Sequence, residues 1–171
     1  MFQDIISLLY VLLPAYVANM APVVFKSLFP QWTYPLDCYK MFWHKRVLGD
    51  HKTWRGLVLG VGAAIGAAFL QAYYLPASWL QTPAGDWLMI GAALGFGAIV
   101  GDSLKSFFKR RRNIKPGKDW VPFDQIDFII GALCFLYPLY AFTLLQALSV
   151  LLISALGHVV IKEFGDGIGL T

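Results

Sequence analysis

The sequence contains little charge for its length. Of its 171 residues, 14% are charged and 58% are hydrophobic, and the mean hydropathy is +0.60. A soluble domain carries about 25% charged residues. The polar surface is therefore too small to coat a globule in water. This excludes an ordinary soluble fold and indicates that lipid is the solvent for much of the chain.

Cysteine pairs and the motifs of common cofactor sites are also missing. Cys38 and Cys134 stand far apart and form no CxxC pair, which favours neither a disulfide framework nor a zinc site. The tripeptide at 116–118 lacks the GxxxxGK pattern of a phosphate-binding loop, and neither GxSxG nor HExxH occurs. No internal repeat is found, which argues against a transporter built from inverted repeats.

Basic residues are absent from two long stretches. No Lys or Arg lies at 56–104 or at 119–161. The cations gather in two segments, 26–55 and 105–118, and only Lys162 follows them. Basic segments that alternate with uncharged ones are typical of cytoplasmic loops in membrane proteins. We therefore predict that both basic segments face the cytoplasm.

The uncharged stretches have the lengths of membrane helices. Residues 56–75 carry no charge and are long enough to cross a hydrocarbon core of about 30 Å. Residues 128–161 reach nearly twice that length and are expected to form two helices. We predict one all-α membrane domain over 1–171, a bundle of about five transmembrane helices with the N-terminus outside and the C-terminus in the cytoplasm. The expected helices cover about 5–27, 54–75, 86–110, 123–140 and 145–163, and the expected cytoplasmic loops about 28–53 and 111–122.

Glycine recurs at intervals of four residues in two of the expected helices. The pairs are Gly56 and Gly60, Gly62 and Gly66, and Gly91 and Gly95. Small residues one turn apart let helix backbones approach closely in lipid, although glycine is also common in membrane helices for other reasons. Together the pairs favour a tightly packed bundle.

The segment 101–128 holds most of the polar side chains that could carry chemistry. A helix that continues past Gly101 would place a stripe of them on one face, at intervals of three and four residues. The stripe consists of Asp102, Lys105, Ser106 and Lys109, with Ser103 and Arg110 beside it. A carboxylate, hydroxyls and cations together suit a metal-bound polyphosphate. The alternative is a helix end whose cations reach the lipid headgroups and set the topology.

Two further acids, Asp124 and Asp127, fall on one face of the first turn of the helix expected at 123–140. In a structural interpretation they only complement the helix dipole, which is worth about 0.3–1 kcal/mol for each acid. In a functional interpretation they bind a hard cation, because Mg²⁺ prefers one or two carboxylates together with phosphate oxygens of a substrate. Asp102 is expected at the same membrane level, which favours the functional interpretation.

The first basic loop repeats this combination of groups. It contains His44, Lys45, Arg46, Asp50, His51, Lys52, Thr53 and Arg55. Its last residues stand at the start of an expected helix, where backbone N–H groups and the dipole favour phosphate. Asn19, within the first span, either forms an interhelical hydrogen bond or lines the site. Nucleic-acid binding is not expected, because few aromatic residues interleave with the basic run.

Four segments of the sequence carry a resemblance to a known family. They are LPAYVANMAPV at 13–23, KRVLGDHKTWRG at 45–56, GDSLKSFFKRR at 101–111 and KPGKDWVPFDQIDF at 115–128. In order and spacing they resemble the CDP-archaeol synthases, which are relatives of the CDP-diacylglycerol synthases. The PGHGG sequence of the bacterial lipid enzymes is absent, and Lys26 stands where a small residue is expected.

The resemblance implies a multi-pass enzyme of the cell membrane with its active site at the cytoplasmic face. It would move CMP from CTP to an unsaturated archaeal lipid, an isoprenoid diether glycerol phosphate, and release pyrophosphate. Mg²⁺ is the implied cofactor, with Asp102, Asp124 and Asp127 as expected ligands. Catalytic roles are expected for Asp124, Asp127 and Lys105. The residues expected to bind substrate are Asn19, Lys45, Arg46, Lys52, Thr53, Arg55, Ser103, Lys109, Arg110, Pro116 and Gly117.

Other functions would also place basic loops in a membrane protein. An anion transporter or channel would attract its substrate with the same cations, but it predicts repeats or charges inside the uncharged spans. A structural membrane protein predicts that Asp124→Ala and Asp127→Ala leave function intact. A CDP-alcohol phosphotransferase needs a motif with four acids across two helices, and the sequence contains only DxxD there.

Overall fold

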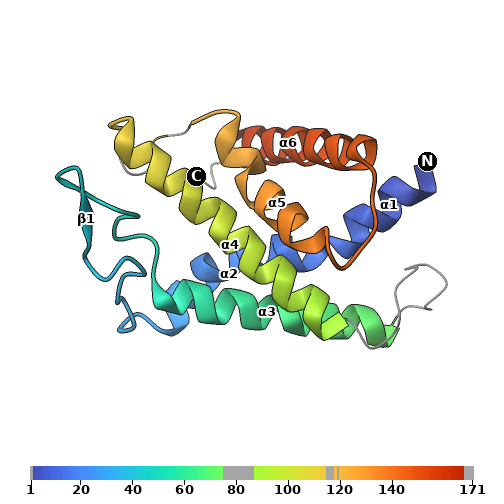
Figure 1. Cartoon of the computed structure of the whole chain (residues 1–171), viewed down its shortest axis with the longest axis horizontal. Helices are drawn as coiled ribbons and strands as arrows, with labels where there is room; N and C mark the ends of the chain where they lie inside the picture. Colours follow the sequence, from blue (N-terminus) through green and yellow to red (C-terminus); the bar gives the residue numbers. More distant parts are fainter. Residues whose placement is uncertain (1, 75–86, 115–117, 119, 168–171) are drawn as a thin grey trace.

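The computed structural model describes residues 2–74, 87–114, 118 and 120–167, with side chains described up to residue 157. The regular structure of this part of the chain is helical apart from one short hairpin, so the predicted all-α class is confirmed (Figure 1). The helices are α1 (Phe2–Val11), α2 (Leu13–Leu28), α3 (Trp54–Tyr74), α4 (Trp87–Arg111), α5 (Phe123–Leu136) and α6 (Leu144–Gly167). The hairpin pairs β1 (Met41–Phe42) antiparallel with β2 (Lys45–Arg46).

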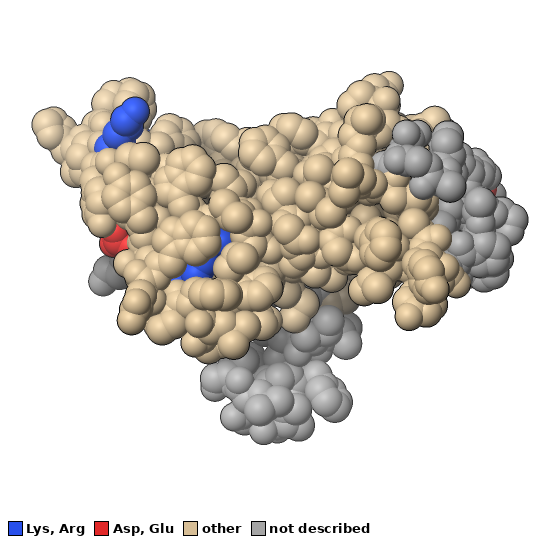
Figure 2. All heavy atoms as spheres, turned by 90° about the horizontal axis from the view of Figure 1, so that it is seen from below, with Lys and Arg blue, Asp and Glu red and all other residues tan. Residues whose placement is uncertain are grey.

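Three helical stretches of the described chain are long and apolar enough to cross a membrane. They are α1 with α2 over Phe2–Leu28, α3 and α4. The 21 residues of α3 extend about 31 Å at a rise of about 1.5 Å per residue, which matches the hydrocarbon core. The 14 residues of α5 extend only about 21 Å. Figure 2 shows a face on which Lys and Arg are visible only in the left-hand half.

Pro14 lies where the first span divides into α1 and α2. Because proline has no N–H, Pro14 cannot donate a hydrogen bond to the carbonyl oxygen of Tyr10, four residues earlier. Gln71 of α3 supplies the missing donor, and its Nε2 lies 2.7 Å from Tyr10 O. Backbone polar groups in lipid need such internal partners. The interruption in one helix therefore fixes its contact with the next.

α4 and α5 pack backbone to backbone at three glycines. A Cβ placed on Gly131 would overlap the carbonyl oxygen of Gly97, and a Cβ on Gly101 would overlap that of Asp127. No other residue allows the two helices to approach this closely. The first turn of α5 is therefore held directly against the polar part of α4.

Only some of the predicted glycine pairs pack against another helix in the structure. Gly91 and Gly95 lie against α3, where a Cβ at either position would come within 2.7 Å of an alanine Cβ. The prediction for Gly62 and Gly66 is wrong, because nothing lies within 4 Å of a Cβ at either position. A four-residue interval marks one face of a helix, but it does not tell which neighbour that face meets.

α5 ends at Leu136, earlier than the expected end at 140. Pro138 follows two residues later and cannot continue the hydrogen-bond ladder of the helix. α6 begins after Thr143, whose Oγ1 accepts a hydrogen bond from Gln146 N at 3.3 Å, while Gln146 Oε1 accepts one from Thr143 N at 2.6 Å. These reciprocal bonds form a capping box, which explains why the helix starts there.

α4 is central, and it packs against α2, α3 and α5. α6 is fixed at the side of the bundle by a hydrogen bond between Tyr16 and Ser154, and Tyr16 also meets Phe128 edge to face. Large apolar side chains on the outer face of α6, such as Leu144 at 76% exposure, are open to the surroundings, as expected for contact with lipid. Figure 1 shows segment 29–53 and the end of α4 together at one end of the bundle, with the N-terminus at the other.

Candidate active site

A single ammonium group holds three carboxylates together at the α4–α5 contact. Lys105 Nζ lies 3.2 Å from Asp102 Oδ1, 3.1 Å from Asp124 Oδ1 and 2.8 Å from Asp127 Oδ2. All four side chains are largely buried. The sequence interval of three residues brings Asp102 to Lys105 within α4, whereas the close glycine contact brings the two α5 acids to them.

Two further lysines extend this ionic cluster. Lys109 Nζ lies 3.0 Å from both carboxylate oxygens of Asp124, and Lys52 pairs with Asp102 from the loop before α3. The cluster thus joins this loop with α4 and α5 and contains three acids and three lysines. In a poorly solvated site, removal of one partner leaves an uncompensated charge, which costs about 3–5 kcal/mol.

The three carboxylates provide the ligand chemistry that magnesium prefers. Within the described ranges, no three Asp, Glu, His or Cys side chains are arranged around a common metal position, because Lys105 stands where the carboxylates converge. The position is one that holds positive charge, and hard carboxylate oxygens fit Mg²⁺. The donor set therefore suits the ion in its chemistry.

A cavity of about 530 Å³ opens beside the cluster, between α2, α3, α4 and the loop that precedes α3. We call it the polar cavity. Predicted site residues that line it are Asn19, Lys52, Thr53, Arg55, Asp102 and Ser103. The hydroxyl of Ser103 and Nε of Arg55 are buried there without a hydrogen-bond partner in the described part of the chain. The polar side chains of its lining suit this cavity to a polar ligand.

A second depression, which we call the apolar groove, lies between α4 and α5 and has a volume of about 420 Å³. Its walls are mostly apolar and include Leu104, Phe108, Ile126, Ile130 and Phe135. Lys105, Arg112, Trp120 and Asp127 also line it. The Asp102–Lys105 ion pair consequently joins the polar cavity to the apolar groove.

The loop before α3 is organised around Asp37, whose side chain is 1% exposed. The carboxylate accepts hydrogen bonds from Arg46 Nη2 at 2.6 Å and from the backbone N–H groups of Leu48 and Gly49 at 3.0 and 3.1 Å. Burial alone would raise the pKa of Asp37, but these hydrogen bonds and the charge of Arg46 outweigh it and lower the pKa to about 2. Asp37 therefore stays ionised and fixes the loop that leads to Lys52.

Several predicted substrate-binding residues have other partners in the structure. Arg46 binds Asp37 and Asp50 and does not line the polar cavity. Lys45 donates to Asn113. Arg110 packs against Gly49, whose positive φ of 86° and close contact with Arg110 suit only glycine. Arg55 lines the cavity, but its Nη1 also donates to Phe29 O at 2.6 Å. Pro116 and Gly117 lie outside the described residues.

Three polar residues at this end of the bundle were not predicted as site residues. Lys26 and His51 line the polar cavity, and Asp37 anchors the loop. Lys26 is the one cation within the helix expected at about 5–27, which was a usable signal. No sequence pattern connects Asp37 with its partners nine to twelve residues later, because an irregular loop has no period.

The fold and the site define an all-helical membrane protein with an ionic cluster between a polar cavity and an apolar groove. The model of the CarS-like CDP-archaeol synthase family matches residues 1–169. The CDP-archaeol synthase of Thermococcus onnurineus is 38% identical over 151 residues, which cover 86% of this chain and 83% of the relative. That of Pyrococcus furiosus is 37% identical over 161 residues, covering 91% and 89%.

A solved structure described as "Structural insight into an intramembrane enzyme for archaeal membrane lipids biosynthesis" is similar in fold. Its TM-score is 0.77 at 31% identity, and the match covers 92% of this chain and 94% of that chain. The chain belongs to the CDP-archaeol synthase family. It is therefore a membrane enzyme with CDP-archaeol synthase activity in archaeal membrane lipid biosynthesis, and the predicted family and activity are confirmed.

Proposed function

We propose that the enzyme transfers CMP from CTP to the phosphate of an unsaturated isoprenoid diether lipid, giving CDP-archaeol and pyrophosphate. The observation that carries this proposal is the Asp102–Lys105 ion pair, which joins a polar cavity to an apolar groove. The two substrates must meet at one point, but the nucleotide needs polar surroundings and the lipid chains need apolar ones.

The polar cavity would bind CTP. Its volume of about 530 Å³ lies within the usual range for small-molecule sites, about 300–1,000 Å³. Lys26, Lys52 and Arg55 bring positive charge for the triphosphate, and Asn19 and Ser103 offer hydrogen bonds.

The apolar groove would hold the isoprenoid chains of the lipid substrate. Its walls match hydrocarbon, and Lys105 and Arg112 provide cations for the lipid phosphate. In this arrangement the chains stay at membrane depth while the phosphate reaches the ionic cluster. The glycines of the α4–α5 contact keep the cluster beside the groove.

The reaction requires positioning and charge neutralisation more than proton transfer. An oxygen of the lipid phosphate attacks the α-phosphorus of CTP, a new P–O bond forms, and the bond to pyrophosphate breaks. The attacking group is already an anion, so no histidine base is needed. Lys105 and Lys52 would neutralise charge on the phosphates as it shifts to the leaving group.

Magnesium would be held by Asp124 and Asp127, with Asp102 as a third ligand or as a partner of the ligands. When bound, the ion would neutralise phosphate oxygens and favour departure of pyrophosphate. Support comes from the convergence of the three carboxylates on one cationic position. Lys105, released from the acids, would then contact a phosphate.

The active site would face the cytoplasm, where CTP is available. We propose five crossings of the cell membrane, with the N-terminus outside and the C-terminus and both basic loops inside, in accordance with the positive-inside rule. The common location of segment 29–53 and the end of α4 supports this topology (Figure 1).

A transfer assay with purified protein in liposomes tests the proposal. Labelled CTP and Mg²⁺ are supplied with either the unsaturated diether phosphate or diacyl phosphatidic acid. We expect lipid-dependent label in the organic phase, higher with the diether, lost with EDTA and restored by Mg²⁺. Equal transfer without magnesium would refute the metal assignment, and a preference for phosphatidic acid would refute the lipid assignment.

A further inference from the structure

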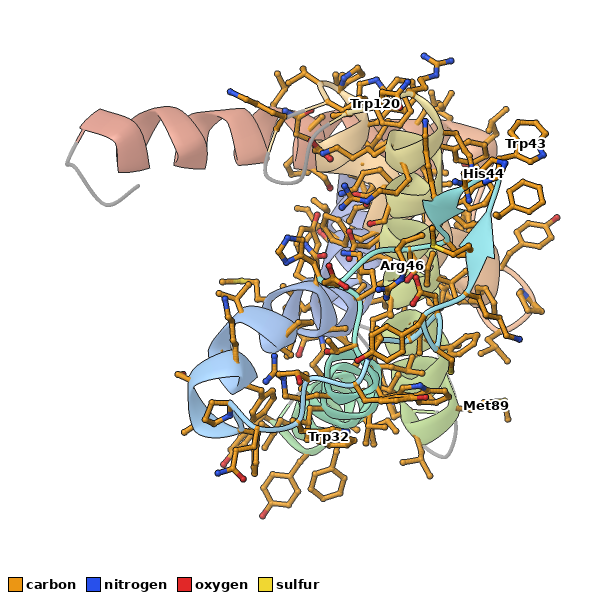
Figure 3. All side chains as sticks on the ribbon, turned by 90° about the vertical axis from the view of Figure 1, so that its left-hand side faces the viewer. Trp32, Trp43, His44, Arg46, Met89 and Trp120 are labelled. Atoms are coloured by element: carbon orange, nitrogen blue, oxygen red, sulfur yellow. The ribbon has the colours of Figure 1, made fainter. Side chains whose placement is uncertain are left out.

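The hairpin β1–β2 presents large aromatic side chains that the described chain does not cover. Trp43 at its tip is 75% exposed, and Met41 and Phe42 beside it are exposed as well. The rings of Phe42 and Trp43 stack with centroids 5.2 Å apart. Figure 3 shows Trp43 and His44 on the hairpin at the right-hand edge of the molecule.

The turn that carries this tip is unfavourable for its own residues. Trp43 and His44 both have positive φ, 48° and 58°, as required by a two-residue hairpin turn that usually contains Asn and Gly. This conformation is unfavourable for a bulky residue, because its Cβ crowds the backbone. A tryptophan that is both strained and exposed indicates that its side chain contacts something other than the folded chain.

The hairpin is firmly attached to the end of α4. Phe42 and Phe107 lie 6.1 Å apart between ring centroids. The guanidinium of Arg111 lies over both rings, 5.0 Å from Phe42 and 4.6 Å from Phe107, and Lys45 donates to Asn113. The position of α4 in the membrane therefore determines the position of the tip.

The length of α4 places this attachment at the surface of the bilayer. Its 25 residues extend about 37 Å, about 7 Å more than the hydrocarbon core. If the helix enters the core near Trp87, its last turn, with Phe107 and Arg111, lies among the headgroups. Tryptophan and tyrosine concentrate at this level because one part of the ring system is apolar and another forms hydrogen bonds.

The charges around the tip are complementary to phosphate headgroups. Lys40 and Lys45 flank the aromatic residues in sequence, and Arg111 lies over Phe42. The described acids of the loop, Asp37 and Asp50, are both paired with Arg46. Cations near an anionic bilayer surface are attracted to it. A surface of this kind fits lipid headgroups better than it fits a basic or neutral protein partner.

We propose that the hairpin tip, Phe42 and Trp43, inserts into the headgroup region of the leaflet in which α4 ends. The occupant of this surface is the bulk bilayer, and it is distinct from the lipid substrate in the apolar groove. Insertion fixes the height of the loop that continues through Asp50 to Lys52 at the polar cavity. The hairpin is thus a membrane anchor for one wall of the active site.

Nitroxide accessibility measures the depth of the tip directly. Trp43→Cys is labelled in a background with Cys38→Ala and Cys134→Ala and reconstituted in liposomes. Oxygen, which partitions into lipid, and a water-soluble nickel chelate serve as relaxation probes. Asp50→Cys, on the same loop with a side chain 82% exposed, is the aqueous control, and Phe69→Cys on the exposed face of α3 is the lipid control.

We expect nickel accessibility at position 43 to be several-fold lower than at position 50, with oxygen accessibility closer to that at position 69. Nickel accessibility equal to that at position 50 would overturn the proposal. Neither result depends on lipid transfer, so failure of this proposal and failure of the proposed function are distinguishable.

Quenching of tryptophan fluorescence keeps the native side chain. The contribution of Trp43 is the difference between the unmodified protein and Trp43→Phe in the same liposomes. We expect strong quenching of this contribution by lipids brominated near the headgroup and weak quenching by iodide. The opposite pattern would place the tip in water, and quenching by neither would place it under protein. Both outcomes would overturn the proposal.

Discussion

Lys105 Nζ of α4 lies 2.8 Å from Asp127 Oδ2 of α5, and this contact depends on a glycine in each helix. Gly101 meets the backbone of Asp127, and Gly131 meets the backbone of Gly97. A side chain at either glycine would separate the helices and draw the carboxylate away from the ammonium group. Helix packing and the chemistry of the site are therefore set by the same contact.

Gly131→Ala tests this relationship. Its Cβ would overlap the carbonyl oxygen of Gly97, and overpacking of this kind costs about 1–3 kcal/mol. We expect a lower unfolding temperature in detergent and loss of CMP transfer. Gly62→Ala is the matched control, because nothing lies within 4 Å of its Cβ and alanine favours a helix over glycine by about 1 kcal/mol. Equal behaviour of the two variants would contradict the proposed packing.

Asp127→Asn and Lys105→Met separate stability from catalysis. Each single change leaves an uncompensated charge, and we expect a loss of about 3–5 kcal/mol of unfolding free energy. The double variant removes both charges and should recover much of that stability. Transfer should remain at least about 10²-fold reduced in all three, because a group that stabilises the transition state is missing.

Unfolding curves measure the stability of each variant, and transfer rates of the same preparations measure its catalysis. Full activity of a folded Asp127→Asn variant would contradict a catalytic role for Asp127. Recovery of activity in the double variant would show that the pair matters only for folding.

The loop before α3 should depend on pH through Asp37. Its pKa in the folded protein is about 2, below the usual 3.8. A depressed pKa contributes stability that is present above pH 3.8 and is lost as the pH falls toward 2. The shift corresponds to about 2 kcal/mol, at about 1.36 kcal/mol per pKa unit.

Hydrogen exchange at the amides of Leu48 and Gly49, corrected for intrinsic rates, checks this expectation. Protection should fall between pH 4 and 2 and should be lost at all pH values in Asp37→Asn. Asp50→Asn should have little effect, because the exposed pair of Asp50 with Arg46 is worth about 0–1 kcal/mol. Constant protection across this pH range would refute the role of Asp37.

The sequence predicted the polar stripe of the site well because that stripe follows a helical period. Asp102 and Lys105 are neighbours in α4 simply because they are three residues apart. Asp124 and Asp127 could be assigned to one helix face for the same reason. Their meeting with Lys105 could not be derived, because it depends on which helices touch and how closely.

Irregular and tertiary features were beyond the reach of sequence patterns. The pairing of Gln71 with the carbonyl oxygen freed by Pro14 joins residues of different helices, and no interval in the sequence encodes it. The same holds for Asp37 and for Arg46, which was expected to bind substrate but supports the loop. The division of the site into a polar cavity and an apolar groove is likewise a property of packed helices.

The central claim, that the two substrates occupy separate cavities and meet at Asp102 and Lys105, is tested most directly by the KM of each substrate. Lys26→Met changes the polar cavity, Ile130→Trp fills the apolar groove, and Leu152→Trp on the exposed face of α6 is the control.

We expect Lys26→Met to raise only the KM for CTP, by about tenfold or more, because a hydrogen bond to a charged group is worth about 1.5–3 kcal/mol. Ile130→Trp should raise only the KM for the lipid, and the control should change neither. If either cavity variant raised both KM values equally, or raised that of the other substrate, the assignment of the two cavities would be contradicted.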